Sequence, residues 1–423
     1  MFFFDSAINT VSRPERLAVK VRTKALSSIR EGHPWLFEDS IEKVSKNGKP
    51  GDIAVIFDSN QKFAAAGLYD PCSPVRVKIF SHSSSLPPVG PDLFDLLAQQ
   101  AARNRQDRIP RDTNAWRLIH GDSDGFPGLV ADRYDCSIVV KVYSAAILPW
   151  LKEMVSALLK TTPGVQHLVV RLSRELQQMK ATLRCGFEDG NIYSLDPASV
   201  SDPWDGIQIF TENGVRFEAD LRNGQKTGFF LDQRGNRAKV GQISGNKDVL
   251  NLFSYSGGFS LYAAKGGAKS VISVDFNKHA IDSCERNFCL NRSIYPAVSR
   301  CRHTGIADDA FHAMEQLRMA QKSFDLIVVD PPSFAKSKEE IPGALHSYAR
   351  LARSAVKLLR KNGTLVFASC SSRVDSDTLF KTVLHAAEMT GRPLQEIQRT
   401  FHEVDHPAKF KESNYLKCLY ARG

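Results

Sequence analysis

Several features that define common protein classes are missing from this chain. None of its eight cysteines forms a CxxC pair, which excludes a zinc ribbon and a thioredoxin-like motif. No apolar run reaches the roughly 18 residues that cross a bilayer. The apolar stretch at the N-terminus is too short for a signal peptide, and it lacks the basic residues with which a signal peptide begins. There is no internal repeat and no low-complexity tract. We therefore expect a cytoplasmic protein without a metal site or a membrane partner, whose cysteines are free thiols.

The composition excludes further classes. Of the 423 residues, 42% are hydrophobic and 24% are charged, which rules out disordered, collagen-like and coiled-coil chains. The formal net charge is +10, and residues 211–423 hold 31 basic and 22 acidic side chains. Basic side chains that neutralise phosphates release the counterions of those phosphates, which favours binding. The excess of basic residues therefore favours a polyanion as binding partner.

Three segments with different patterns follow one another. Residues 15–82 hold short strands bounded by turn residues and predict a small β-barrel. After a linker rich in Ser and Pro, residues 92–205 mix helical periodicity with strands and predict an α+β domain. Residues 206–423 alternate short apolar runs with helices, which predicts a parallel sheet covered on both faces and a multidomain α/β protein. Helices are predicted over residues 93–108, 148–159 and 343–361.

A first motif lies where a predicted strand runs into a helix through Gly257. An acidic residue, Asp275, closes the next strand. Glycine lets the backbone approach a ligand, and the carboxylate can accept both hydroxyls of a ribose. The full glycine set of a pyrophosphate site is missing, so we favour a nucleoside without a pyrophosphate. The alternative is an ordinary turn with a surface aspartate.

A second motif, Asp330-Pro331-Pro332, follows the next buried strand, and Phe334 comes directly after it. Ligands of open α/β sheets bind beyond the carboxyl ends of the strands, so this carboxylate should face a site. The prolines hold a rigid loop, and Phe334 can stack on a flat substrate or pack as an ordinary core aromatic.

The following strand ends at Cys370, which puts a thiol at the same edge of the sheet. We interpret Cys370 as a nucleophile. The other cysteines we interpret mostly as buried small hydrophobic residues: Cys72, Cys136, Cys185, Cys284, Cys289, Cys301 and Cys418.

Two polar stretches leave their roles open. Residues 224–234 connect two predicted elements and contain more polar side chains than a simple connector needs. They can bring Gln233 and Arg234 toward a bound carboxylate. Alternatively, they form a hairpin that leads into a helix. Asp308 and Asp309 follow the third predicted strand of the C-terminal segment. At this position a carboxylate can meet an adenine amino group or cap a helix.

Together these residues resemble the class I S-adenosylmethionine-dependent methyltransferases, and more closely the large-subunit ribosomal RNA (cytosine-5) methyltransferase I family. The resemblance also rests on His33-Pro34-Trp35, on residues 119–132 and on Tyr415-Leu416-Lys417. It implies an N-terminal PUA domain that binds RNA, a middle domain and a C-terminal Rossmann-like catalytic domain. It further implies ribosomal RNA as partner and permits a homodimer.

The resemblance assigns roles to individual residues. Cys370 and Asp330 would be catalytic. From the chemistry of the base we hypothesise that Cys370 is the nucleophile and that Asp330 holds the base edge and assists protonation at N3. Pro331, Pro332 and Phe334 would contact the substrate. The cofactor, S-adenosylmethionine, would be bound by Phe230, Gln233, Arg234, Phe253, Tyr255, Ser256, Gly257, Asp275, Phe276, Asp308, Asp309 and Asp330.

The sequence departs from the family at two places. Residues 172–205 match poorly, and Ser333 stands where many relatives carry Lys. A related branch that methylates guanine shares the Asp-Pro-Pro motif but has no cysteine at the position of Cys370, which makes that thiol the discriminator. Three hypotheses stay open: a cytosine-5 methyltransferase, a methyltransferase of the same fold acting on guanine or on a protein, and a non-catalytic RNA-binding assembly factor.

Overall fold

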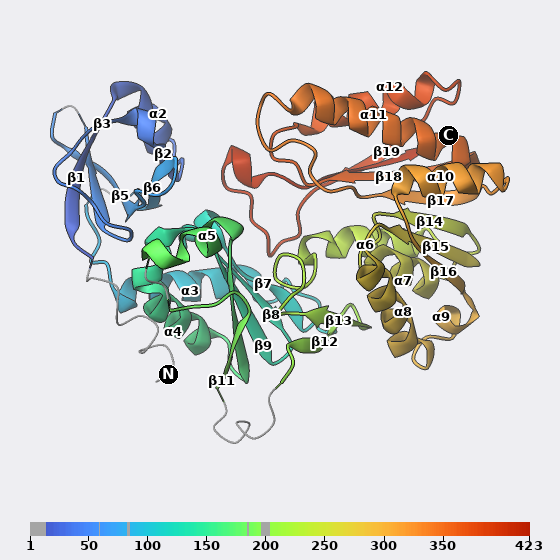
Figure 1. Ribbon diagram of the computed structural model, residues 1–423, viewed down its shortest axis with the longest axis horizontal. Coiled ribbons are helices and arrows are strands. Elements are labelled where there is room, and N and C mark those ends of the chain that lie inside the picture. The colour runs from blue at the N-terminus through green and yellow to red at the C-terminus, as the bar shows by residue number, and fades with distance from the viewer. Residues whose placement is uncertain (1–13, 59, 83–84, 184–185, 196–203) are drawn as a thin grey trace. The chain divides into compact units, whose positions relative to one another are not determined.

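The computed structural model describes residues 14–58, 60–82, 85–183, 186–195 and 204–423 (Figure 1). These residues form two compact units that interleave along the chain. The first takes its described residues from Met1–Thr211, Ala219–Leu231 and Val404–Phe410, and the second contains Glu212–Glu218, Asp232–Glu403 and Lys411–Gly423. The three predicted domain ranges, 15–82, 92–205 and 206–423, stay predictions. None of the described helices is both long and apolar enough to cross a membrane.

The first unit begins with a six-stranded sheet in the order β2-β6-β5-β4-β1-β3. Its neighbouring strands are antiparallel except for β1 and β4, which run parallel. Alternation explains the first strand, since every second side chain of β1 is buried. The elements are β1 (Arg16–Val21), α2 (Thr23–Arg30), β2 (Trp35–Phe37), β3 (Ile41–Val44), β4 (Ile53–Phe57), β5 (Phe63–Tyr69) and β6 (Val75–Ser81).

The same unit holds a five-stranded sheet in the order β11-β10-β9-β8-β7. Its strands are β7 (Ala115–His120), β8 (Leu129–Tyr134), β9 (Ser137–Val142), β10 (His167–Leu172) and β11 (Asn191–Ser194), and its helices are α3 (Pro91–Arg105), α4 (Leu151–Thr161) and α5 (Arg174–Leu183). The predicted start of α4 was wrong: residues 145–150 form a 3-10 turn that contains Pro149. The strands β12 (Ile207–Glu212) and β13 (Val215–Asp220) pair with each other.

The second unit is built on a seven-stranded sheet in the order β16-β15-β14-β17-β18-β20-β19. The first five strands of that order run parallel, and β20 is antiparallel to both of its neighbours. Buried Val, Ile and Leu dominate the central strands, as expected where helices cover both faces. The strands are β14 (Asp248–Leu252), β15 (Ser270–Asp275), β16 (Arg302–Ala307), β17 (Phe324–Val329), β18 (Leu359–Ser369), β19 (Gln395–Thr400) and β20 (Lys417–Arg422).

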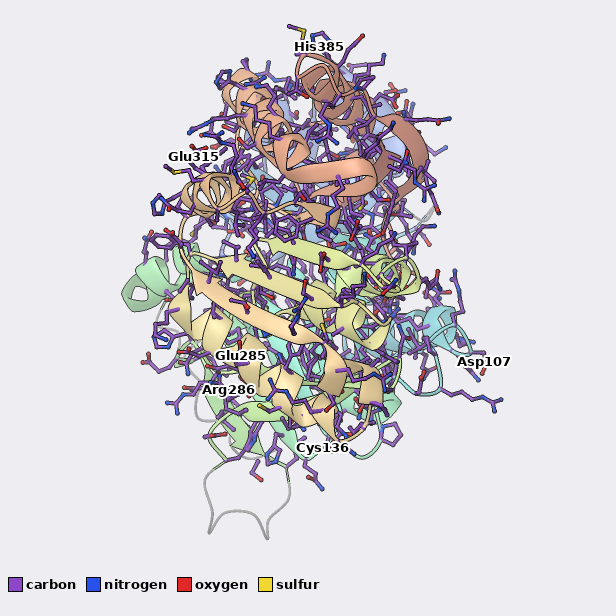
Figure 2. The ribbon with its side chains drawn as sticks, turned by 90° about the vertical axis from the view of Figure 1, so that its right-hand side faces the viewer. Asp107, Cys136, Glu285, Arg286, Glu315 and His385 are labelled. Carbon is purple, nitrogen blue, oxygen red and sulfur yellow. The ribbon has the colours of Figure 1, made fainter. Side chains whose placement is uncertain are left out.

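Helices cover this sheet on both faces, which confirms the predicted layers. Figures 1 and 2 show α10, α11 and α12 on one face, marked in Figure 2 by Glu315 and His385, and α8 on the other, marked by Glu285 and Arg286. The helices are α6 (Arg234–Gln242), α7 (Gly258–Lys265), α8 (Lys278–Arg292), α9 (Pro296–Arg300), α10 (Ala310–Met319), α11 (Ile341–Leu358) and α12 (Ser376–Glu388). The predicted helix over 343–361 was too long, because residues 359–361 already belong to β18.

Candidate active site

The parallel strands of the second unit end level with one another. Leu252 of β14 pairs with Val274 of β15 and with Val329 of β17, and Val329 pairs with Phe367 of β18. The loops that follow these strands therefore start at one edge of the sheet. That edge is where open α/β folds bind their ligands.

The loop after β14 has an unusual backbone. Phe253 and Tyr255 have positive φ angles of 59° and 47°, although bulky residues rarely adopt this region. Gly257, at φ 80°, has no such cost, and a Cβ at this position would lie 2.1 Å from the Cys284 sulfur. Strain of this kind persists where the surrounding structure holds it, and it gathers at ligand sites.

Asp275 is held in place at the end of β15. Its Oδ2 accepts a hydrogen bond from the Tyr255 backbone N–H at 2.8 Å, and its Oδ1 accepts one from the Asn277 N–H at 2.9 Å. The carboxylate is thus tied to the strained loop, and its oxygens keep further lone pairs for ribose hydroxyls. The next residue, Phe276, is 83% exposed.

Two buried hydroxyls in the loop test whether the site fits a nucleoside cofactor. Neither Ser254 Oγ nor Ser256 Oγ has a hydrogen-bond partner among the residues that the structure describes. The Ser256 carbonyl, by contrast, accepts a bond of 2.9 Å from the Asn287 side chain. Because buried hydroxyls are rarely left without a partner, these two groups fit a loop that closes around a polar ligand.

The two aspartates after β16 are engaged with α10. Asp309 is the N-cap of this helix, and its side chain accepts hydrogen bonds from the backbone N–H groups of Phe311 and His312. Asp308 bonds to the His312 ring at 2.5 Å. The capping alternative is therefore realised for Asp309, and the contact of either residue with adenine stays a prediction.

Asp330, at the end of β17, belongs to a chain of polar side chains. Gln233 donates to Asp330 Oδ2 at 2.9 Å, and Asn236 donates to the Gln233 oxygen at 2.6 Å, which fixes the amide orientation. Burial, and after it the neighbouring charge of Asp232, raises the pKa of Asp330 to about 7. A carboxyl group with this pKa can hold a proton at neutral pH and donate it.

The rest of the polar connector divides between the two units. Arg234 is buried and forms an ion pair with Glu403 at 3.1 Å. Glu403 thus already binds one of the guanidinium nitrogens of Arg234. Binding of a cofactor carboxylate by Arg234 stays a prediction. Phe230 lies in the segment Ala219–Leu231, which packs with the first unit, and its predicted role is likewise untested.

The Asp-Pro-Pro loop leads into the hydrophobic core. Pro331 is buried, Pro332 is exposed, and Phe334 packs beside Tyr348 with ring centroids 5.0 Å apart. The Tyr348 hydroxyl hydrogen-bonds to Ser369 at the end of β18. Phe334 therefore shows the packing alternative, and stacking on a substrate stays a prediction for it.

Cys370 differs from the other cysteines in its surroundings. It is partly exposed at the end of β18, the strand next to β17. Burial raises the pKa of Cys284 to about 12 and that of Cys301 to about 11, so these thiols stay protonated at neutral pH. The expectation of burial was wrong for Cys72 and Cys289, which are exposed, and Cys185 lies outside the described residues.

The sequence interpretation gave no role to Lys417, although the residue lies at this edge. It pairs with Ser369 across the antiparallel β18 and β20 strands. Its ammonium group is buried and donates to the carbonyls of Ser371 and Val374, on the segment that follows Cys370. Burial lowers the pKa of Lys417 to about 8, while the nearby Cys370 acts in the opposite direction. A cation thus lies close to the thiol.

Two family models match the chain. The model for S-adenosylmethionine-dependent methyltransferases matches residues 192–415, and a model for PUA-like domains matches residues 19–82. The second match confirms the predicted type of N-terminal domain. The first covers more than half of the chain and contains Gly257, Asp275, Asp330 and Cys370, whereas Lys417 lies just beyond the matched range.

Similar proteins support the same assignment. A Deinococcus radiodurans protein named ribosomal RNA large subunit methyltransferase is 40% identical over 97% of this chain and 98% of its own length. A Vibrio cholerae protein named ribosomal RNA large subunit methyltransferase I is 34% identical over 96% and 98%. A Streptococcus mutans methyltransferase shares the fold, at 20% identity and a TM-score of 0.79 over 96% of this chain and 100% of its own. The chain therefore belongs to the S-adenosylmethionine-dependent methyltransferase family, with a PUA-like domain near its N-terminus.

Proposed function

We propose that this protein methylates C5 of a cytosine in large-subunit ribosomal RNA through a transient bond between Cys370 and the base. The observation that carries the proposal is the placement of two groups on adjacent strands. A partly exposed thiol ends β18, and a carboxyl group with a pKa of about 7 ends β17. The names of the relatives support ribosomal RNA as the substrate class. A cytoplasmic location and a homodimer stay predictions.

The chemistry needs both groups because C5 of cytosine is a poor nucleophile. The Cys370 thiolate forms a bond from Sγ to C6, and Asp330 gives its proton to N3 as the ring takes up the electron pair. C5 then has the electron density of an enamine. After C5 has gained its new substituent, its proton leaves to water, the C6–Sγ bond breaks, and N3 returns its proton to Asp330.

The residues around the strained loop fit the role of cofactor site. When bound, S-adenosylmethionine supplies an electrophilic methyl group. Gly257 lets the loop turn at positive φ while it packs against Cys284, Asp275 accepts from the ribose hydroxyls, and the hydroxyls of Ser254 and Ser256 gain polar partners. The chain's own task is to hold the base so that C5 lies in line with the group it receives.

Lys417 is a positioning residue in this proposal. Its ammonium group ties down the segment that follows Cys370 through two carbonyls, and its charge favours the thiolate over the thiol. A nucleophilic cysteine needs such a neighbour because the thiolate is the reactive form.

Methyl transfer onto deproteinised large-subunit ribosomal RNA, read by nucleoside mass spectrometry, tests the proposal. The wild-type protein should form 5-methylcytosine, and Cys370→Ala should form none while it still binds S-adenosylmethionine in calorimetry. Cys289→Ala, which removes an exposed thiol on α8, is the matched control and should keep full activity. Methylated guanine, or full activity of Cys370→Ala, would contradict the proposal.

A further inference from the structure

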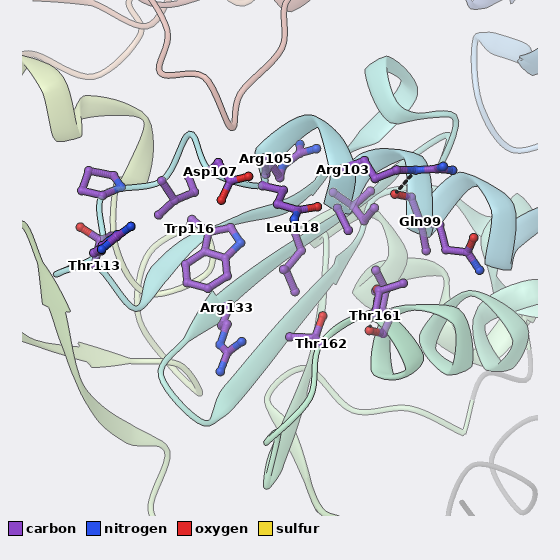
Figure 3. A pocket seen from close by; sticks show the side chains of 18 residues that line it. Gln99, Arg103, Arg105, Asp107, Thr113, Trp116, Leu118, Arg133, Thr161 and Thr162 are labelled. Carbon is purple, nitrogen blue, oxygen red and sulfur yellow. Dashed lines mark hydrogen bonds between the residues drawn. The ribbon is translucent and has the colours of Figure 1, made fainter.

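A hollow in the first unit is lined by none of the residues of the candidate active site. It has a volume of about 660 Å³ and lies between the end of α3, the loop over residues 106–113, the strands β7 and β8, and the end of α4 (Figure 3). Its lining comes entirely from the first unit. The volume falls in the range of small-molecule and cofactor sites, so one nucleotide can be accommodated.

The charged residues that line the hollow are mostly basic. Four arginines contribute to it, namely Arg103, Arg105, Arg111 and Arg133, against one acidic residue, Asp107. Arg105 is buried and is engaged by Asp124 at 2.6 Å. Arg103 and Arg111 are exposed, and Arg133 is half-buried. Guanidinium groups are suited to phosphate oxygens, because their donors form a planar fork.

An aromatic ring lies within this basic lining. Trp116 of β7 is half-buried, and the Arg133 guanidinium lies over its ring, 5.1 Å from the centroid (Figure 3). Apolar side chains, among them Leu118 and Leu158, also line the hollow. Tryptophan beside arginines is the combination on which single-stranded nucleic acids stack their bases while their phosphates are held.

We propose that this hollow binds an unpaired nucleotide of the RNA substrate, with its base on Trp116 and its phosphates held by Arg103, Arg111 and Arg133. The excess of basic groups favours RNA over a peptide. Because the hollow is bounded by two helices, we expect it to accept a base that is unpaired and unstacked. The bases of a duplex are stacked on one another and cannot enter it. The inference rests on the proposed function, since it takes the substrate to be RNA, and it adds a second contact on the unit that lacks the catalytic thiol.

Fluorescence anisotropy of the full-length protein with a labelled single-stranded hexanucleotide at fixed salt tests the inference. Stacking on an aromatic ring contributes about 1–3 kcal/mol, so Trp116→Ala should weaken binding by roughly 5- to 150-fold, whereas Trp116→Phe should stay within about threefold. The double variant Arg103→Gln/Arg111→Gln should flatten the dependence of affinity on salt. If Trp116→Ala fails to fold, Arg111→Glu, at an exposed side chain, should still weaken binding at least fivefold.

Two control variants separate this site from general effects of charge and aromatics. Trp204→Ala removes a tryptophan of the same unit that stacks on His167, and Arg318→Gln removes a positive charge from α10. Both should bind the hexanucleotide like the wild type. Unchanged binding by folded Trp116→Ala and Arg111→Glu would overturn the inference. Equally tight, Trp116-dependent binding of duplex RNA would also overturn it.

The outcomes also separate this inference from the proposed function. If the wild type forms no 5-methylcytosine but binds the hexanucleotide through Trp116, the proposed function fails and the nucleotide site stands. If methylation occurs and every Trp116 and arginine variant binds normally, the nucleotide site fails alone.

Discussion

The side-chain amide of Gln233 donates a 2.9 Å hydrogen bond to the carboxyl group of Asp330, which lies 97 positions further along the chain. Asn236 holds the other end of that amide, so the donor faces Asp330 in a fixed orientation. The bond stabilises the charged form, but burial and Asp232 outweigh it and leave the pKa of Asp330 near 7. This balance makes Asp330 a proton donor at neutral pH.

Replacing this carboxyl group should lower activity and raise stability. Asp330→Asn should reduce methyl transfer by about 10²- to 10⁴-fold, the usual range for loss of a general acid. The pKa of Asp330 is raised from 3.8 to about 7 on folding, so its contribution to stability is full below pH 4 and is lost as the pH rises through 7. At pH 8 the variant should therefore unfold at a higher temperature than the wild type and be more stable by about 1–4 kcal/mol, because each unit of pKa change corresponds to about 1.4 kcal/mol.

Thermal unfolding at pH 8 and at pH 4 checks this prediction, because the difference between the two proteins should shrink at the lower pH. A variant that is less stable than the wild type at pH 8 would contradict the prediction, because it would show that folding favours the ionised form of Asp330.

Removing the charge of Lys417 should slow the chemistry of Cys370. In Lys417→Met less of the thiol is present as thiolate, so alkylation of Cys370 by iodoacetamide at pH 7 should slow by about tenfold, and kcat should fall with little change in KM. Since the pKa of Lys417 is about 8, the wild type loses this charge as the pH rises through 8. The alkylation rates of the two proteins should thus converge above pH 9, and a constant ratio at all pH values would contradict the electrostatic role.

A methyl group at position 257 should damage the cofactor loop. Gly257→Ala places its Cβ 2.1 Å from the Cys284 sulfur in a backbone of positive φ, which should cost about 1–3 kcal/mol. Calorimetry should show at least tenfold weaker binding of S-adenosylmethionine. The double variant Gly257→Ala/Cys284→Ala should recover part of the loss because the sulfur is gone while the backbone strain remains. Wild-type affinity in the single variant would contradict this account of the loop.

The buried ion pair between Glu212 and Arg237 should matter for stability in the second unit. The two side chains lie 2.5 Å apart and are almost fully buried. Glu212→Gln leaves a buried guanidinium without its counter-charge and should cost about 3–5 kcal/mol. Denaturant unfolding gives the value, and Glu315→Gln, which breaks an exposed pair with Arg318, should cause no measurable change. Equal midpoints for both variants would contradict the prediction.

The sequence predicted the parts of the fold that local patterns determine. The central strands β14, β15, β17 and β18 are short apolar runs between helices, and their ends place Asp275, Asp330 and Cys370 at one edge. The strand β19 was missed because its sequence QEIQRT is polar and mostly exposed. Such an edge strand lacks the alternation that marks a half-buried strand.

The contacts that tune the site could not be predicted, because they join distant positions. Lys417 reaches Cys370 only through the pairing of β18 with β20, and Gln233 reaches Asp330 through tertiary packing. Local capping was foreseen as an alternative at Asp309, and the structure shows it. Sequence patterns thus indicated which residues gather at the edge, whereas their hydrogen-bond partners and protonation states came from the fold.

The central claim is that Cys370 bonds to C6 of the target cytosine, and trapping that bond tests it most directly. In RNA that contains 5-fluorocytidine the fluorine at C5 cannot leave as a proton does, so the adduct persists after methyl transfer. With S-adenosylmethionine present, peptide mass spectrometry should find the nucleotide on the peptide that contains Cys370, and Cys289→Ala should behave in the same way. An adduct on another residue, or 5-methylcytosine formed at the normal rate by Cys370→Ala, would contradict the account.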